Sequence, residues 1–582
     1  MHTRITYARS LLLLGVLLLT LSARGQFAAA QPSAATPPTS EATATAAVAT
    51  AHDPITHEEN ARVPEGAAWT QHYFPSSDGS EVELHADVLL PEALAEGEKA
   101  PVILSVGAYF GHSGEMAVED WEHTGPSDRY NDLIEGADLF DRGYALVMVD
   151  LRGFGGSTGC LDFMGPGEQA DVQAAIDWAA NQPWSTGAVG MYGKSYDAIT
   201  GLVGNNLDQD ALKAVVAQEP IWDLYRNIWS NGVPQSTIVD VSRTYNEIAT
   251  LPQLPDDDER YRTNAAYEQA NPLCLWLNSI GYQDADPASE YWQFRNLAER
   301  AKGSDTPLFF TQGFLEWNTE AEAMEDFLAN HEGSQRGWLG QWDHVRGNDH
   351  IADGRLAMGR EGWFEEVMSF YDQYLKGIEP TVSYPAYAIQ DSTGAWPIVD
   401  RAVSISLGGG SYLDNGVVAD PAVQASNSFF VWSEPVEQPT RITGTPRVTL
   451  EAEGHGNVLV ELYDVAPDGS AVMFDRQAAV VKPGTISFDL RSTDWMLPAG
   501  HTLAVEIGTI MPGFALDNDW IDTPSNTTIT ISAAQLDLAF DDPGNDAPTS
   551  GSPAPWLETY RLGYTEQLSP GAPSFTLPMG DR

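Results

Sequence analysis

The spacing of hydrophobic residues divides the chain into parts of different character. Between residues 85 and 220, continuous apolar runs such as "APVILSVGAYF" and "GYALVMVD" alternate with segments of helical periodicity such as "GEQADVQAAIDWAANQ". Continuous apolar runs are typical of strands that are buried on both faces of a sheet. Because strand and helix alternate, this pattern predicts an α/β domain with a mainly parallel sheet.

The pattern changes twice further along the chain. Residues 222–302 are rich in Trp, Tyr, Asn and acidic residues and contain no strong strand, which predicts an inserted helical cap. Strand patterns return at "TPLFFTQG" and "RGWLGQW". From about residue 384, short alternating segments such as "RVTLEAEG" and "TLAVEIG" are separated by Gly, Pro and Asp turns. This second pattern predicts an antiparallel β-sandwich.

The first residues of the chain have the composition of an export signal. Arg4 and Arg9 precede the short apolar run "LLLLGVLLLTLSA", and a small-residue cleavage site follows at Ala30. Such a segment predicts a secretory signal peptide, and hence a secreted or periplasmic, extracytoplasmic location. The expected organisation is a signal peptide over 1–30, a disordered linker over 31–60, the α/β domain over 61–221 and 303–383, the helical cap over 222–302, and the β-sandwich over 384–582.

The charge of the chain excludes several kinds of partner. The formal net charge is −52, which argues against nucleic acid and against an anionic membrane surface. The sequence predicts neither a metal nor a cofactor. Acidic clusters such as "PDDDE" and "DNDWID" lack a full calcium loop and are interpreted as solvated loops. Formation of a homo-oligomer is left open.

The stretch "GMYGKSYDA" places Ser195 between an apolar strand and a predicted helix. A nucleophilic serine needs such a tight strand–turn–helix, with small neighbours, to project its hydroxyl from the sheet. Gly193 supplies one small neighbour. The pattern departs from G-x-S-x-G because the second small residue, Ala198, comes one place late. We predict that Ser195 is a nucleophile, the alternative being an ordinary turn.

A serine hydroxyl needs an adjacent base, and the base needs an orienting carboxylate. After the next two predicted strands come Glu316, in "FLEWN", and His344, in "DHVRG". The order Ser, acid, His suits a catalytic triad whose members follow successive strands. Asp343 is a rival acid and His350 a rival base.

A tetrahedral intermediate also needs hydrogen-bond donors for its oxyanion. The backbone N–H of Tyr196 follows the nucleophile directly, and the phenol of Tyr109 lies after an early apolar strand. We predict that these two groups form the oxyanion hole. The alternative for Tyr109 is a packed aromatic side chain in a loop.

With these motifs in order, the chain resembles the X-prolyl dipeptidyl peptidase and cocaine esterase family of α/β-hydrolases. The resemblance covers roughly residues 65–575 and rests on stretches such as "GYALVMVDLRGFGGSTG", "GQWDHVRG" and "LPAGHTLAVEIG". It implies an α/β-hydrolase fold with an inserted helical cap and a C-terminal jelly roll, attack by Ser195, a proton shuttle at His344 and an oxyanion contact at Tyr109. Glu316 departs from the family, which usually has Asp.

Three functions are therefore considered. The first is a secreted serine hydrolase that releases X-Pro dipeptides from free N-termini through an acyl-enzyme, acting on small peptides. The second is an esterase or acylase of the same family, of the cocaine esterase, α-amino-acid ester hydrolase or β-lactam acylase type. The third is a non-catalytic binding protein with a relict hydrolase domain.

Further expectations concern the substrate and the cysteines. A dipeptidyl peptidase must hold an ammonium group, and Glu219 and Asp223 are candidates because they open the cap. Trp222 and Tyr225 are candidates for an apolar pocket, with core packing as the alternative. Asp150 and Arg152 are interpreted as structural partners. Because an exported chain permits a disulfide, Cys160 and Cys274 are expected to pair, with two buried thiols as the alternative.

Overall fold

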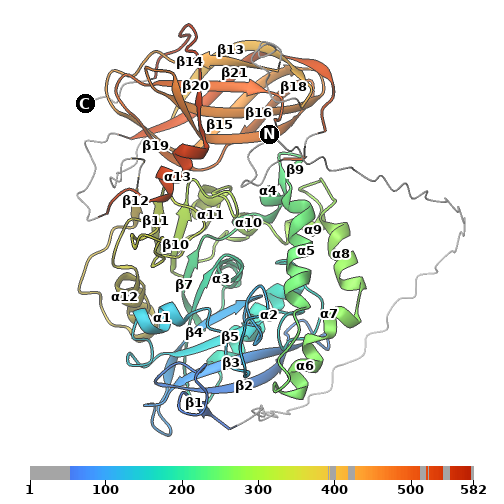
Figure 1. Ribbon diagram of the computed structural model, residues 1–582, viewed down its shortest axis with the longest axis vertical. Helices are drawn as coiled ribbons and strands as arrows, with labels where there is room; N and C mark the ends of the chain where they lie inside the picture. Colours follow the sequence, from blue (N-terminus) through green and yellow to red (C-terminus); the bar gives the residue numbers. More distant parts are fainter. Residues whose placement is uncertain are drawn as a thin grey trace, which may run out of the picture. The chain divides into compact units, whose positions relative to one another are not determined.

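The computed structural model describes residues 53–390, 392, 402–416, 427–511, 520–521, 523–541 and 551–577. The predicted signal peptide and most of the predicted linker lie outside these residues. Within them, no helix is both long enough and apolar enough to cross a membrane. The chain forms an α/β domain, a set of cap helices and a C-terminal β-sandwich (Figure 1).

A central sheet organises the α/β domain, in the strand order β1-β2-β3-β5-β4-β6-β7-β10-β11-β12. From β5 onward in this order, each strand is parallel to the next, so the carboxyl ends of these strands meet at one edge. β5 pairs with β3 antiparallel. All residues of β4 and β5 are buried, as their continuous apolar runs predict. The strands span Ile55–Thr56, Ala67–Pro75, Glu83–Pro91, Ala100–Gly107 and Ala145–Asp150 (β1 to β5), then Ser185–Lys194, Leu212–Gln218, Leu308–Gly313, Gln335–Gly340 and Tyr387–Ile389 (β6, β7, β10, β11 and β12).

Helices cover both faces of this sheet. One hydrophobic core joins the sheet to α2 (Pro166–Ala180), α3 (Tyr196–Asn206) and α11 (Met324–Asn330), and another joins it to α1 (Asn131–Gly136) and α12 (Trp363–Lys376). The buried face of α2 is the one that the helical periodicity predicts, with Val172, Ile176 and Ala179 fully buried. The result is the α/β-hydrolase arrangement in which loops at one sheet edge carry the chemistry.

The chain between β7 and β10 forms the helical cap that the sequence predicts, together with a short β8–β9 hairpin. Helix α5 packs against α8 within this cap. The cap elements are α4 (Leu224–Ile228), β8 (Trp229–Ser230), β9 (Val233–Pro234), α5 (Thr237–Ala249), α6 (Glu259–Ala265), α7 (Tyr267–Ala270), α8 (Leu273–Gly281), α9 (Glu290–Gln293) and α10 (Leu297–Arg300).

The expected disulfide is present and ties this cap to the α/β domain. Cys160 lies in the loop after β5, and its partner Cys274 lies on α8. The bond closes a loop with a sequence separation of 114 residues. It therefore restricts where α8 can lie relative to the sheet.

Removing this disulfide is expected to destabilise the cap. In the loop-entropy model, closing a loop of this length contributes about 4–5 kcal/mol. The double variant Cys160→Ser, Cys274→Ser should therefore melt several degrees below the wild type in calorimetry without reductant. An unchanged thermogram would mean that the bond contributes nothing to stability.

The C-terminal part forms two antiparallel sheets that pack face to face around a core of their own, which confirms the predicted β-sandwich. The first sheet contains β13 (Ala402–Asp414), β21 (Thr527–Asp541), β15 (Thr440–Glu453) and β18 (Gly484–Asp489), with β19 (Thr493–Leu497) paired to β15; the second contains β14 (Ser428–Trp432), β20 (Thr502–Gly508), β16 (Gly456–Val465), β17 (Ser470–Val481) and β22 (Thr565–Gln567). Helix α13 (Trp556–Gly563) precedes β22.

Candidate active site

Ser195 occupies the sharp turn between β6 and α3. Its backbone has φ 64° and ψ −124°, a left-handed conformation that non-glycine residues rarely adopt. Such strain persists only where the surroundings enforce it, and it concentrates at functional sites. The turn therefore has the geometry of a nucleophile elbow, which the motif around Ser195 predicts.

The residues around this turn explain why the chain needs small side chains here. A Cβ atom on Gly193 would lie 2.3 Å from the backbone of Asp197, so only glycine fits. Ala198 is fully buried, and its methyl group is accommodated. The Asp197 carboxylate accepts hydrogen bonds from Arg129 and from the Tyr130 hydroxyl, the latter at 2.7 Å. These contacts fix the first turn of α3 against the sheet.

The predicted acid, Glu316, is fully buried just after β10. Its carboxylate accepts hydrogen bonds from the backbone N–H groups of Asn318, Thr319 and Glu320, at 2.7–2.9 Å, and from the Thr319 hydroxyl at 2.6 Å. Burial alone would raise the pKa of Glu316, but His344 and these donors outweigh it and lower the pKa to about 2. Glu316 is therefore ionised at any working pH.

The structure brings His344 against this carboxylate. His344 Nδ1 lies 3.4 Å from Glu316 Oε1, a separation that suits a hydrogen bond which tightens when substrate binds. The rival base, His350, is exposed and pairs through its backbone with Leu356. Because β6, β10 and β11 are parallel, Ser195, Glu316 and His344 follow the same edge of the sheet.

Burial and the positive charge of Lys194, beside the nucleophile, lower the pKa of His344, and Glu316 opposes them. The base must be neutral to accept the serine proton, and a lowered pKa keeps it neutral in more acidic solution. The acid limb of kcat/KM is therefore expected below pH ~6.5, the ordinary value for histidine.

The variant Lys194→Met should move this acid limb to higher pH, because it removes the charge that disfavours the imidazolium. Lys213→Met, which changes an exposed lysine on β7, is the matched control. Identical pH–rate profiles for both variants would contradict the role of Lys194.

The β-sandwich holds the loop that carries the acid. Leu315 and Trp317, on either side of Glu316, are buried in the core of the sandwich rather than in that of the α/β domain. The guanidinium carbon of Arg491 lies 4.1 Å from the ring centre of Trp317, and Arg491 also bonds the carboxylate of Glu320. The position of Glu316 thus depends on the C-terminal domain.

The predicted oxyanion groups both lie beside Ser195. Tyr196 supplies the first amide of α3, and the first amides of a helix lack intrahelical acceptors. The Tyr109 hydroxyl interacts with the side chain of Ser195, and burial raises its pKa, so it stays a hydrogen-bond donor. The Arg129 guanidinium also lies over the Tyr109 ring, with its central carbon 4.2 Å from the ring centre.

Sequence reasoning missed Tyr245, on cap helix α5. Its hydroxyl lies 2.7 Å from that of Tyr109. If Tyr245 donates to the Tyr109 oxygen, the Tyr109 hydrogen is free to point to the oxyanion. The only signal in the sequence is an aromatic residue in a helical cap, which does not say which strand loop it meets.

Replacing Tyr109 by phenylalanine is expected to lower kcat by about 10²–10³-fold, the usual cost of losing one oxyanion donor. KM should change little, because the hydroxyl acts on charge that develops only in the transition state. Tyr245→Phe should produce a smaller loss in kcat. Steady-state kinetics on a chromogenic substrate checks both, and full activity in Tyr109→Phe would remove this residue from the oxyanion hole.

Glu219 does not lie where an ammonium group could reach it. It is fully buried, and its carboxylate accepts bonds from Gly313 N–H at 2.8 Å and Trp342 Nε1 at 2.9 Å. Burial and the nearby charge of Glu316 raise the pKa of Glu219 to about 8. Glu219 ties together the ends of β7, β10 and β11, so the expected contact with a substrate is corrected to a structural one.

The other three candidates for substrate binding are also buried. Asp223 caps helix α4 by accepting the Tyr225 N–H at 3.0 Å, and burial raises its pKa to about 6. Trp222 donates to Gln312 at 2.9 Å and packs on Phe310 and Phe327. Tyr225 donates to a backbone carbonyl of the cap. Core packing, the alternative for Trp222 and Tyr225, accounts for those two side chains, and helix capping accounts for Asp223.

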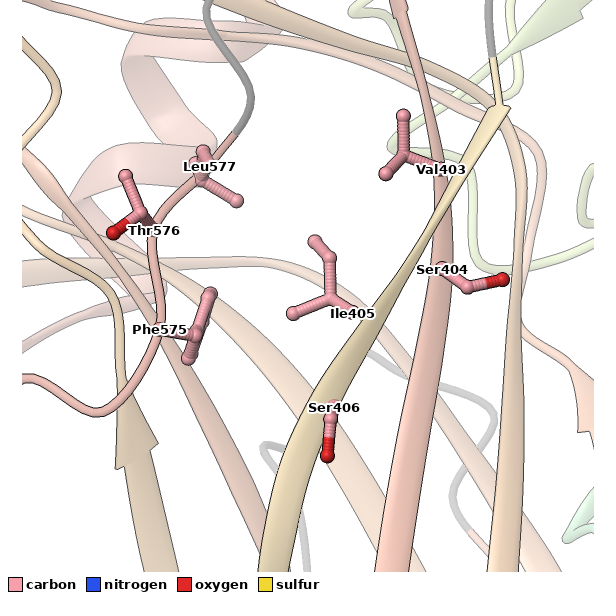
Figure 2. Close-up of a pocket in the computed structure, with 7 residues that line it drawn as sticks. All are labelled: Val403, Ser404, Ile405, Ser406, Phe575, Thr576 and Leu577. Carbon is pink, nitrogen blue, oxygen red and sulfur yellow. The ribbon is translucent and has the colours of Figure 1, made fainter.

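Asp150 and Arg152 make structural contacts, as expected. Arg152 forms ion pairs with Asp171 at 2.7 Å and Asp78 at 2.8 Å, and Asp150 bonds His85. A separate pocket lies on the sandwich, between β13 and the segment 575–577 (Figure 2). Its lining contains no titratable group, so it carries no hydrolytic chemistry. The lining residues are Val403, Ser404, Ile405, Ser406, Phe575, Thr576 and Leu577.

The fold and this site define a serine hydrolase of the α/β-hydrolase class. Residues 78–346 match the family model of X-Pro dipeptidyl-peptidases (S15 family), and residues 409–537 match the model of the X-Pro dipeptidyl-peptidase C-terminal non-catalytic domain. The chain belongs to this S15 family, as the resemblance in the sequence implies.

Individual relatives span most of the chain. A Streptomyces avermitilis protein with the provisional name Xaa-Pro dipeptidyl-peptidase is 25% identical and covers 79% of this chain and 80% of its own length. Cocaine esterase of Rhodococcus is 23% identical over 68% of this chain and 84% of its own. An aminopeptidase structure from a marine sediment Thaumarchaeota archaeon has a TM-score of 0.60 at 17% identity and covers 81% of this chain and 97% of its own.

Proposed function

We propose that the protein is an X-prolyl dipeptidyl peptidase that releases X-Pro dipeptides from free N-termini. Ser195 Oγ attacks the carbonyl carbon of the proline residue while His344 accepts the hydroxyl proton. Tyr109 and the Tyr196 N–H bind the resulting oxyanion. His344 then gives its proton to the departing amine, and water hydrolyses the acyl-enzyme by the reverse sequence of proton transfers.

The observation that carries this proposal is an aromatic cluster against the nucleophile. Tyr245 packs at its centre, with ring-centre distances of 5.0 Å to Tyr196, 5.4 Å to Phe163 and 6.3 Å to Phe154. Rigid aromatic side chains gathered around Tyr196, the residue after the nucleophile, suit a pyrrolidine ring better than a long flexible chain. The match to the X-Pro dipeptidyl-peptidase models supports the same substrate class.

A peptidase of this kind also needs a carboxylate for the substrate ammonium, and we assign this role to Glu115. It lies on the loop that follows Tyr109, its side chain is 31% exposed, and it pairs with Arg129 at 3.0 Å. Arg129 in turn covers Tyr109. This places a reachable negative charge on the loop that bears the oxyanion donor.

The test compares Ala-Pro-p-nitroanilide, its N-acetylated form and p-nitrophenyl butyrate. We expect the free anilide to be the best substrate, with the acetylated form at least tenfold poorer. In Glu115→Gln this preference for a free N-terminus should become smaller, because KM for the free anilide should rise. Ester cleavage without any anilide cleavage would overturn the peptidase proposal and leave the serine hydrolase assignment intact.

An esterase or acylase is the second candidate. It is favoured by the similarity to cocaine esterase and to the structure of an α-amino acid ester hydrolase, which has a TM-score of 0.56 at 17% identity. The triad attacks esters and amides alike, so the same panel decides between the two activities.

We also propose that the chain is exported and cleaved after Ala30. The support is the positively charged start of the chain and the short apolar run that lies between it and Ala30. Expression of the whole chain in a bacterial host, followed by N-terminal sequencing of the extracytoplasmic fraction, tests this. A chain that keeps its first residues and stays in the cytoplasm would contradict it.

A further inference from the structure

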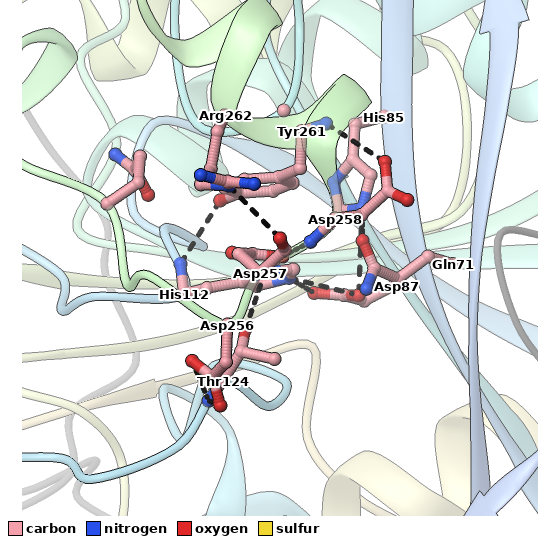
Figure 3. Close-up of polar contacts among 12 residues, drawn as sticks. Gln71, His85, Asp87, His112, Thr124, Asp256, Asp257, Asp258, Tyr261 and Arg262 are labelled. Atoms are coloured by element: carbon pink, nitrogen blue, oxygen red, sulfur yellow. Dashed lines mark hydrogen bonds and ion pairs between the residues drawn. The ribbon is translucent and has the colours of Figure 1, made fainter.

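A cluster of potential metal ligands lies beneath the cap, outside the catalytic site. His85 and Asp87 come from β3, and His112 comes from the loop after β4 (Figure 3). Their ligand atoms all lie within 4.8 Å of one another. The three residues are at most 1% exposed, so the cluster is closed to solvent.

The two imidazoles are oriented as metal ligands usually are. His85 Nδ1 lies 2.8 Å from Asp150 Oδ2, and His112 Nδ1 lies 2.7 Å from Asp257 Oδ2. A carboxylate at Nδ1 holds the proton there and leaves the Nε2 lone pair for a cation. Both Nε2 atoms face the Asp87 carboxylate, the third group of the cluster.

Three separations among these side chains are close to those of a tetrahedral site. Bonds of 2.0–2.2 Å to zinc place neighbouring ligand atoms about 3.4 Å apart. His112 Nε2 lies 3.1 Å from Asp87 Oδ2, and His85 Nε2 lies 3.8 Å from Asp87 Oδ1. The side-chain oxygen of Gln71, on β2, lies 3.2 Å from His85 Nε2 and supplies a fourth donor.

We propose that His85, Asp87, His112 and Gln71 bind one Zn²⁺ ion. Imidazole with carboxylate favours zinc over calcium or magnesium, which prefer oxygen ligands alone. A divalent cation also offsets the buried carboxylates of Asp87, Asp150 and Asp257, whose charges are costly in the interior. This proposal departs from the prediction made from the sequence, which is that no metal is bound.

The surroundings make this site structural rather than catalytic. The Tyr261 ring, from cap helix α6, stacks on His112 at 4.0 Å and meets His85 edge-on at 4.8 Å. Trp69 Nε1 donates to Asp87 at 2.7 Å. The ion would join the sheet to the cap at Asp257 and to the loop that carries Tyr109, three residues before His112.

The experiment uses the full chain without a histidine tag, stripped with a chelator and then titrated with Co²⁺ and with Zn²⁺. We expect one equivalent of either ion per chain by elemental analysis. Co²⁺ should produce the visible absorption of a tetrahedral complex, and Zn²⁺ should raise the thermal midpoint by several degrees. The variants His85→Gln and Asp87→Asn should lose the absorption and the thermal shift.

The matched control is His501→Gln, which removes an imidazole that bonds one carboxylate, Asp464 at 2.7 Å, in the β-sandwich. It should bind the ion as the wild type does. Where the first two variants fail to fold, His85→Cys provides a positive signal, because a thiolate ligand adds a charge-transfer band to the cobalt spectrum. A folded wild type that binds no ion, or binding that His85→Gln leaves unchanged, overturns the proposal.

Discussion

Replacing Ser195 by alanine is expected to lower kcat/KM by about 10⁴–10⁶-fold, as when a serine nucleophile is removed from a working triad. Alanine keeps the Cβ atom, so the backbone at φ 64° carries the same strain and the fold should be retained. The measurement is kcat/KM on the best substrate, together with mass spectrometry of the fluorophosphonate adduct.

The adduct should form on the wild type and be absent from Ser195→Ala. Ser80→Ala, which changes an exposed serine before β3, is the control and should label and hydrolyse normally. Retention of activity in Ser195→Ala would end the triad account, whatever the true substrate is.

Replacing Glu316 by glutamine is expected to lower kcat by about 10⁴-fold, the cost of losing the orienting carboxylate of a triad. An amide N–H₂ cannot accept the proton that His344 Nδ1 offers, so the imidazole turns to the wrong tautomer. Glu316→Asp keeps the negative charge, and Asp is the residue that the resemblance implies for this position. This variant should therefore lose far less of kcat. Equal losses in both variants would show that length rather than charge matters here.

The Glu316 variants also bear on stability. The folded pKa of Glu316 is about 2, below the unfolded value of about 4.3, so its contribution is present above pH ~4.3 and is lost as pH falls toward 2. In the wild type, part of the acid-induced loss of stability between these values comes from Glu316. Glu316→Gln should lack that part.

Much of the fold follows from the sequence pattern. Continuous apolar runs are found as β4 and β5, the periodic segment as α2, and the alternating C-terminal segments as the sandwich. The pairing of Glu316 with His344 follows from the same logic, since parallel strands end at a common edge. The elbow at Ser195 follows from small residues at a strand–helix junction.

The sequence does not show which side chains pack against one another at that edge of the sheet. Glu219 comes at a strand end and looks available, but the donors that enclose it come from the ends of β10 and β11. Tyr245 is a single aromatic residue in a cap helix, and only the packing of the cap places it on Tyr109. Such contacts join residues more than 90 positions apart, which no local pattern encodes.

The histidine cluster was missed for a related reason. His85 and His112 are not spaced along the sequence like the ligands of a metal-binding motif. Their carboxylate partners, Asp150 and Asp257, lie even further along the sequence. The side chains come together because β2 pairs with β3 and because the loop after β4, a strand separated from β3 by β5, brings His112 to Asp87.

Leu315 and Trp317, which flank the predicted catalytic acid Glu316, are buried among the residues of the C-terminal domain. This limits how such chains can diverge by recombination. A gene fragment that encodes only the first domain would leave these two large apolar side chains exposed and the loop that carries Glu316 without its packing partners. The two domains are therefore expected to evolve as a pair. Exchanging one of them between distant homologues will require residues that pack against Leu315 and Trp317 in the same way.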